Sequence, residues 1–363
     1  MDMPEPTPPQ QALQKLPRKA QWALLLVLSA VITILFELLH LPAALLIGPM
    51  IAAIIAGVNG ATLRVPKLAF ATGQSVVGCL VAASVTTDIF TALVVDWPLV
   101  LISLATTLAG SSFLGWFISR LRILPGTTAV WGSSPGAATA MVLMADAFGA
   151  DSRLVAFMQY LRVIMVSLSA ALIARLWVDT SGVTVPVEPW FPALDPQAFG
   201  ATVLVVVVGG TLGTVFRLPS AHFLGSMIVG AIVSLGFGIQ LQLPEWLLGL
   251  SYVAIAWTIG LNFTLPILRH AARALPQVVA SILALMALCG GLAWILSHEL
   301  GVDPLTAYLA TSPGGMDSVA IIAAASGTVD MSFVMALQAA RFLFVLLFGP
   351  MIAKLIARTI RPE

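Results

Sequence analysis

One short polar motif occurs twice in this sequence, each time inside a long apolar run. The segment 132–139 reads Gly-Ser-Ser-Pro-Gly-Ala-Ala-Thr, and the segment 310–318 reads Ala-Thr-Ser-Pro-Gly-Gly-Met-Asp-Ser. Proline removes a backbone donor and glycine permits a positive φ, so neither copy is expected to continue as a regular helix. The next apolar run after each copy contains an arginine, Arg162 or Arg341. Broken backbone and charge are costly in lipid and are tolerated where they line a cavity, so the motif predicts a site.

The residue types in the two copies suit a small anion. Helix ends at a break present N–H groups with partial positive charge, and glycine lets a ligand approach the backbone. An arginine can hold a carboxylate through two parallel hydrogen bonds. We therefore predict the following substrate-binding residues: Ser133, Ser134, Gly136, Thr139, Arg162, Thr311, Ser312, Gly314, Gly315, Asp317, Ser318 and Arg341. Gln159 and Gln338 lie three residues before the arginines, on the same helix face, and are predicted to support them.

Each of these residues also has a purely structural interpretation. Serine and glycine let membrane helices pack closely, and the arginines could bond to backbone carbonyls or to a nearby carboxylate. Asp317 breaks the similarity between the copies, because its counterpart is Thr139. It could bind a coupling H⁺ or Na⁺, or pair with Arg341. Asp151 and Asp330 stand where the following helices are expected to begin, and are predicted to be helix caps or first-turn acids.

The composition is that of an integral membrane protein. Of the 363 residues, 59% are hydrophobic and 9% are charged, whereas a soluble domain carries about 25% charged residues. The net charge of +1 gives no reason to expect a nucleic acid partner. The four histidines and two cysteines stand apart in the sequence, so no metal or other cofactor is expected. An enzymatic activity is left open but is not favoured.

The apolar runs are near the ~20-residue length that spans a bilayer. In the first half they cover 22–39, 43–58, 68–87, 98–118, the interrupted run 126–149, and 154–176. In the second half they cover 197–216, 220–238, 249–268, 275–297, the interrupted run 304–327, and 332–356. We predict a disordered cytoplasmic tail (1–20), a first membrane repeat (21–178), a link outside the membrane (179–196), a second repeat (197–357) and a short cytoplasmic tail (358–363).

The two halves correspond at a nearly constant offset, which predicts an internal duplication. Pro135 corresponds to Pro313 at an offset of 178, and Arg162 to Arg341 at an offset of 179. Cytoplasmic loops carry an excess of Lys and Arg, and corresponding loops here switch sign: 59–67 with 239–247, 119–125 with 298–303, and 269–274 with 88–97. The repeats are therefore predicted to be inverted, with both termini in the cytoplasm. Each would hold about five transmembrane helices plus a Ser-Pro-Gly segment that forms a re-entrant hairpin or a broken helix.

Through the paired Ser-Pro-Gly segments and the Gln-x-x-Arg helices, residues 20–357 resemble the AbrB family of bacterial membrane proteins. The resemblance implies an inner-membrane protein with an internal duplication. Members of that family are labelled ammonia monooxygenases or regulators of gene expression. The first label fits this sequence poorly, because copper and iron sites need clustered His or carboxylate ligands.

These observations favour a secondary transporter that moves a small anionic solute by alternating access between inverted repeats. No nucleotide-binding loop is present, so transport would be coupled to H⁺ or Na⁺, or would be facilitative. The alternatives are a membrane regulatory protein that affects gene expression indirectly, and an intramembrane enzyme that uses Asp317 and the hydroxyl groups. The expected partners are the solute and the lipid bilayer, and the formation of a homo-oligomer is left open.

Overall fold

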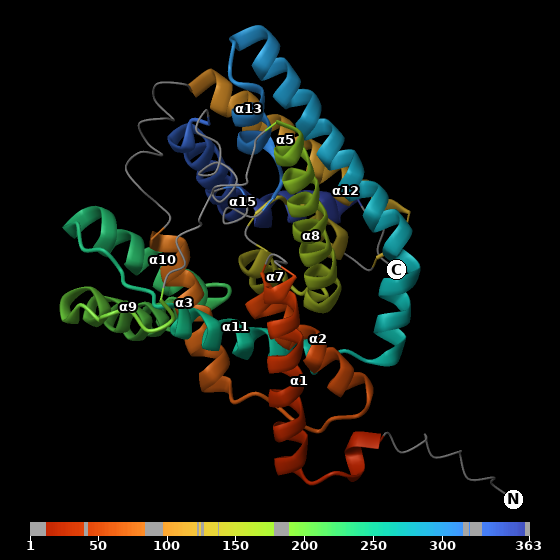
Figure 1. The fold of residues 1–363 in the computed structure, drawn as a ribbon, viewed down its shortest axis with the longest axis vertical. Coiled ribbons are helices and arrows are strands. Elements are labelled where there is room, and N and C mark those ends of the chain that lie inside the picture. Colours follow the sequence, from red (N-terminus) through yellow and green to blue (C-terminus); the bar gives the residue numbers. More distant parts are fainter. Residues whose placement is uncertain are drawn as a thin grey trace, which may run out of the picture.

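The computed structural model describes residues 12–39, 43–83, 97–121, 123–124, 127–136, 138–177, 189–314, 319 and 329–359. Within these residues every regular element is a helix, which confirms the predicted all-α class for this part of the chain (Figure 1). The first half contains η1 (Ala12–Lys15), α1 (Arg18–Leu38), α2 (Ala44–Val58), α3 (Lys67–Ala83), α5 (Trp97–Arg120), α6 (Thr128–Ser133), α7 (Ala138–Ala147) and α8 (Ser152–Trp177). The second half contains α9 (Pro196–Val215), α10 (Ala221–Ala231), the π-helix η2 (Ile232–Gly236), α11 (Glu245–Gly260), α12 (Leu265–Leu300), α13 (Pro304–Thr311) and α15 (Met331–Thr359).

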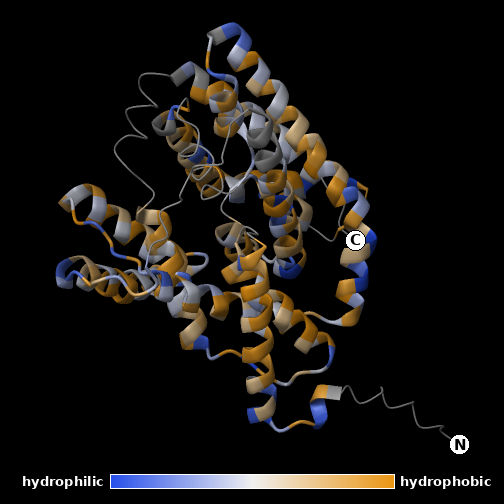
Figure 2. Ribbon diagram, viewed as in Figure 1, coloured by the Kyte–Doolittle hydropathy of each residue, from blue (hydrophilic) through white to orange (hydrophobic). Residues whose placement is uncertain are grey.

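Five of the described helices are long and apolar enough to cross a membrane: α1, α5, α9, α12 and α15. Figure 2 shows apolar residues along most of their length, with polar residues gathered at helix ends and connections. Large apolar side chains are exposed on them, as at Leu26 of α1 (55%) and Val207 of α9 (60%). Such a surface is unfavourable in water and suits lipid.

The helices form two groups (Figure 1). In the first helix group α10 packs on α3 and α9, α2 packs on α1 and α11, and α3 packs on α11. The second helix group contains α5, α6, α7, α8, α12, α13 and α15. The main contacts between the two groups are made by α8 with α11 and by α7 with α3. The two groups therefore contact each other much less extensively than the helices within either group do.

The helices of the first group pack closely. A Cβ at Gly213 of α9 would lie 1.9 Å from the carbonyl oxygen of Ala221, and one at Gly225 of α10 would lie 2.1 Å from that of Gly209. Only glycine allows the two backbones to approach this closely. Packing through small residues is typical of helix pairs in membranes.

The first interrupted run is broken as predicted. α6 ends at Ser133, and α7 begins at Ala138 after a break at the Ser-Pro-Gly sequence. In the second copy α13 ends at Thr311 and the chain leaves the helix at Ser312. The predicted site residues Gly315, Asp317 and Ser318 lie outside the described residues.

The loop predicted at 269–274 is wrong, because these residues lie within α12. That helix begins at Leu265 and not at residue 275. The apolar pattern stops at Arg269 and Arg273, but arginine is a good helix former and does not end the helix. Pro266 stands in the first turn, where its fixed φ favours helix initiation.

Part of the segment predicted as a disordered tail is helical. Residues 12–20 form η1 and the start of α1. The buried Gln21 holds them, since its Nε2 donates to the carbonyls of Leu13 (2.9 Å) and Leu16 (3.0 Å) and its Oε1 accepts from the backbone N–H of Thr62 (2.9 Å). Residues 1–11 lie outside the described part.

Candidate functional site

In the first copy of the motif, Gln159 and Arg162 of α8 hold the broken backbone. Gln159 Nε2 donates to the carbonyls of Trp131 (2.8 Å) and Ser134 (3.0 Å). Arg162 Nη1 donates to the carbonyl of Ser134 (2.8 Å), while Nη2 donates to Gln159 Oε1 (2.6 Å) and to the carbonyl of Gly136 (3.3 Å). The predicted supporting glutamine therefore bonds both to the arginine and to the motif.

The second copy repeats this arrangement. Gln338 Nε2 of α15 donates to the carbonyls of Leu309 (2.7 Å) and Ser312 (3.1 Å). Arg341 Nη1 donates to the carbonyl of Thr311 (3.1 Å), and Nη2 donates to Gln338 Oε1. In both copies the guanidinium and the amide satisfy carbonyl groups that the end of a short helix leaves without intrahelical partners.

A threonine ties the start of each motif helix to the helix that carries the arginine. Thr128 Oγ1 accepts from the backbone N–H of Asp151 (3.2 Å), and Thr306 Oγ1 accepts from that of Asp330 (3.3 Å). The side chain of each aspartate accepts a backbone N–H in the first turn of its own helix. This confirms both as helix caps.

The two copies meet along α8. A Cβ at Gly314 of the second copy would lie 3.1 Å from Val166 Cγ1, one helical turn after Arg162. The motif helix α13 of the second copy also contacts α8. The fold thus brings together two motifs that lie almost 180 residues apart in the sequence.

Arg162 and Arg341 are both buried, with 2% and 5% of their surface exposed. No carboxylate oxygen among the described residues lies within 4 Å of either guanidinium. The Nε of each has no hydrogen-bond partner in the described part of the chain. Within the described part of the chain, two buried positive charges with spare donors and no close carboxylate are an arrangement that favours an anion.

The predicted hydroxyl groups differ in their bonding. Ser134 Oγ donates to the carbonyl of Val130 (2.8 Å), and Ser312 Oγ lies 3.4 Å from that of Leu309. These two hydroxyls are therefore used within their own helix ends. Thr139 Oγ1 lies 3.4 Å from the hydroxyl of Tyr160.

Ser133 and Thr311 occupy corresponding positions, but their hydroxyl groups have different surroundings. Thr311 Oγ1 donates to the carbonyl of Ala307 (2.8 Å) and lies 3.2 Å from that of Cys289. Ser133 Oγ is buried and has no hydrogen-bond partner among the described residues. Among the described residues, the hydroxyl of the first copy therefore has no partner, whereas the hydroxyl of the second copy is bonded to a carbonyl of its own helix.

A second polar feature, which no sequence pattern predicted, is a cavity of about 310 Å³ at the boundary between the two helix groups. Its polar lining comes from the turn between α7 and α8 and from the end of α11: Asp146, Asp151, Ser152, Arg153, Thr258 and Asn262. No local motif marks it, because its two sides are more than 100 residues apart in the sequence.

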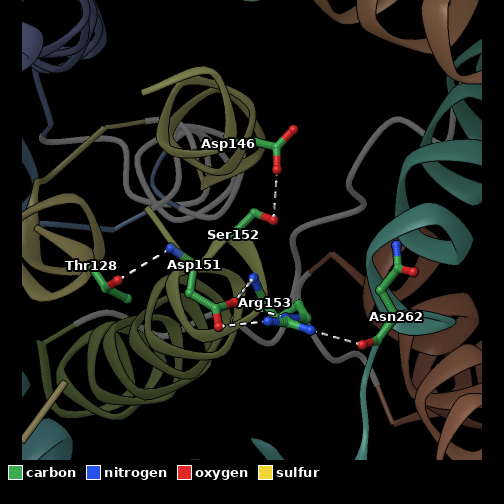
Figure 3. A network of polar contacts seen from close by, with 6 residues as sticks. All are labelled: Thr128, Asp146, Asp151, Ser152, Arg153 and Asn262. Carbon is green, nitrogen blue, oxygen red and sulfur yellow. Dashed lines mark hydrogen bonds and ion pairs between the residues drawn. The ribbon is translucent and has the colours of Figure 1, made fainter. Parts of the chain in front are cut away.

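Arg153 is the central side chain of this boundary cavity. Figure 3 shows it between Asp151 and the carbonyl group of Asn262. Its Nε and Nη2 donate to the two carboxylate oxygens of Asp151, both at 2.9 Å, and its Nη1 donates to the carbonyl of Asn262 (3.1 Å). The guanidinium thus connects α8 of the second helix group with the end of α11 in the first.

The Asp151 carboxylate stays ionised over the physiological range. Burial raises its pKa, but the hydrogen bonds and charge of Arg153 lower it by more, so the pKa lies below its ordinary value of 3.8. A lowered carboxyl pKa means that the ion pair stabilises the protein above the ordinary value and is lost as the pH falls through the folded-state value. The connection is therefore fully formed at neutral pH.

Comparison with known proteins places the chain in a family. A family model described as "Transition state regulatory protein AbrB" matches residues 45–357. This chain belongs to the AbrB family. It is 49% identical over 338 residues to the Escherichia coli K12 protein named "Putative regulator AbrB", covering 93% of this chain and 97% of that protein. It is 25% identical over 296 residues to "Uncharacterized protein YhjN" of Bacillus subtilis 168, covering 77% and 76% of the two chains. The family resemblance noted from the motifs is thus confirmed.

Proposed function

We propose that this AbrB family protein is a secondary transporter that moves a small anionic solute across the bacterial inner membrane by alternating access. The observation that carries the proposal is the pair of buried guanidinium groups at two converging helix breaks, with no described carboxylate in reach. Broken helices at a shared site are the usual construction of ion and solute sites in secondary transporters. We assign solute binding to the residues of both copies that the sequence predicted as substrate-binding.

An internal duplication is part of the proposal, and the backbone supports it. Ala43 and Ser220 are both non-glycine residues with positive φ (56° and 50°), and each precedes its helix at an offset of 177. Gly60 and Gly238 also share a positive φ (82° and 68°) at an offset of 178. Left-handed backbone is rare enough that such matches favour two copies of one ancestral unit.

Helix packing supports the same duplication. α6 packs on α8 as α13 packs on α15, and α5 packs on α6 as α12 packs on α13. Together with the reversal of loop charge, this favours two repeats of opposite orientation around a common site. Each Gln-Arg pair then serves the break in its own repeat.

The two helix groups provide the movement that alternating access requires. Their mutual contacts are few compared with the contacts inside each group. A displacement at this boundary would change the access to the paired motifs without unpacking either group. The boundary cavity and Arg153 lie where such a displacement would occur.

Uptake into liposomes tests the proposal directly. Purified protein would be reconstituted, and a mixture of labelled mono- and dicarboxylates would be offered under a proton gradient, a Na⁺ gradient or no gradient. We expect accumulation of at least one carboxylate above protein-free liposomes. Dependence on one gradient would identify the coupling ion, and equal uptake without a gradient would indicate facilitative transport. Absence of uptake for every carboxylate offered, with correctly inserted protein, would contradict the proposal.

The names of the family model and of the Escherichia coli relative suggest a regulatory function as a second candidate. A transporter changes the concentration of a metabolite, and gene expression then responds indirectly. Measuring the transcripts of a deletion strain complemented with folded Arg341→Lys protein separates the two. If that variant cannot transport but restores the transcript pattern, the protein regulates independently of transport.

A further inference from the structure

A very small cavity lies beside Arg162, apart from the boundary cavity. It has a volume of about 10 Å³, which is room for about one water-sized atom. Residues of α5, α6, α8 and α12 line it: Leu114, Gly132, Ser133, Met158, Arg162, Ser281, Ile282 and Leu285. A Cβ at Gly132 would lie 2.2 Å from Met158 Sδ, so glycine is needed for α6 and α8 to enclose this space.

Two of the lining residues carry buried polar atoms without partners. Ser133 Oγ and Arg162 Nε have no hydrogen-bond partner among the described residues, although these residues are only 7% and 2% exposed. Native structures rarely leave buried polar atoms unpaired, because the desolvation is then uncompensated. Both atoms can donate, and they belong to two residues that line the same cavity.

The local charge decides which kind of acceptor fits best. Arg162 lines the cavity, and no described carboxylate oxygen lies within 4 Å of its guanidinium or of that of Arg341. Ser281 Oγ already donates to the carbonyl of Val278 (2.9 Å). These surroundings stabilise a negatively charged acceptor more than a neutral one.

We propose that this cavity binds one acceptor atom of an anion, either a halide ion or a single carboxylate oxygen, held by Ser133 Oγ–H and Arg162 Nε–H. The inference rests on the proposed function in taking the solute to be anionic. It adds that the first copy of the motif makes this contact and the second does not. The hydroxyl of Thr311, at the position corresponding to Ser133, is bonded to a helix carbonyl.

Bromide binding to the full-length protein tests this site. Thermal unfolding would be followed while bromide replaces the bulky anion isethionate at constant ionic strength, with formate as a second titrant. In the wild-type protein we expect the unfolding midpoint to rise with bromide concentration above the dissociation constant, because a ligand of the folded state stabilises it. Ser133→Ala should raise the dissociation constant fitted to this rise by about ten-fold or more, since it removes a hydrogen bond to an anion. The control Thr202→Val changes a buried threonine of α9 whose hydroxyl donates to the carbonyl of Ala198 (3.1 Å), and it should leave that constant unchanged.

Anomalous diffraction from crystals soaked in bromide provides a second measurement that needs no variant. A peak within hydrogen-bond distance of Ser133 Oγ and Arg162 Nε supports the inference. No bromide peak combined with no stabilisation by formate, or the same titration curve for Ser133→Ala and wild type, overturns it and leaves a water molecule as the occupant. Stabilisation by formate but not bromide identifies a carboxylate oxygen, and the reverse identifies a halide. Carboxylate uptake that survives in the absence of any bromide or formate effect would overturn this inference while the transport proposal stands.

Discussion

Arg162 and Arg341 combine a structural task with spare binding capacity. Their Nη atoms bond to the backbone at the breaks and to a glutamine, while Nε remains without a described partner. The two interpretations that the sequence left open, carbonyl bonding and solute binding, are therefore compatible at the level of individual nitrogen atoms. Only a planar group with several fixed donors can perform both tasks, and lysine cannot.

We predict that Arg341→Lys loses most solute uptake while the protein still inserts and folds. An ammonium group is a point charge and cannot bridge the Thr311 carbonyl and Gln338 Oε1 while a donor remains for the solute. Uptake in liposomes, with thermal unfolding as a check on folding, measures this. The equivalent change Arg162→Lys should behave in the same way.

The double variant Asp317→Ala with Arg341→Ala separates binding from ion pairing. If Arg341 pairs with Asp317, removing the arginine alone would cost about 3–5 kcal/mol, because a buried charge is left without its partner. Recovery of both folding and transport in the double variant would make Arg341 an ion-pair partner and not a solute ligand. Recovery of folding alone would leave the anion-site interpretation standing.

At the scale of elements, each short motif helix is docked by a glutamine. Gln159 is completely buried and joins the end of α6 to α8 through two carbonyls. We predict that Gln159→Leu lowers the free energy of unfolding by about 1–3 kcal/mol, because buried carbonyl groups and an Arg162 donor lose their partner. Denaturation in detergent measures the effect. Gln242→Leu is the control, since Gln242 also bonds to a backbone carbonyl but lies in an exposed connection, and its substitution should change little.

The elements also show what could be predicted from the sequence. The breaks and the Gln-x-x-Arg helices could be predicted from the local sequence. Pro and Gly interrupt a helix, and a charged residue is unusual in an apolar run. The start of α12 could not be predicted, because hydropathy does not distinguish a charged helical turn at Arg269 and Arg273 from a loop. The boundary cavity could not be predicted either, since Asp151 and Asn262 come together only through tertiary packing. The contrast between Ser133 and Thr311 depends on rotamers and neighbours that no sequence pattern encodes.

For the whole molecule, inverted repeats predict that corresponding connections face opposite sides of the membrane. The connection 59–67 should face the cytoplasm, and its counterpart 239–247 the other side. Single cysteines would be placed in each on a Cys79→Ala, Cys289→Ala background and labelled in intact cells with an impermeant reagent. Both native cysteines are buried, and alanine is only slightly smaller than cysteine, so this replacement should be tolerated. Labelling of both connections from the same side would exclude the inverted arrangement.

The guanidinium that connects the two helix groups at the boundary cavity has no counterpart in the other half of the chain. At an offset of 179, the position of Arg153 is taken by Ser332, which cannot form an equivalent ion pair. If the halves are inverted and the protein transports by alternating access, a charged contact holds one face closed and no equivalent contact holds the opposite face. The conformational cycle is then kinetically asymmetric. Opening one face requires the Arg153 contact to break, whereas opening the opposite face does not. Half-saturation by the solute would therefore differ between the two sides, while the equilibrium distribution of the solute stays fixed by the driving gradient alone.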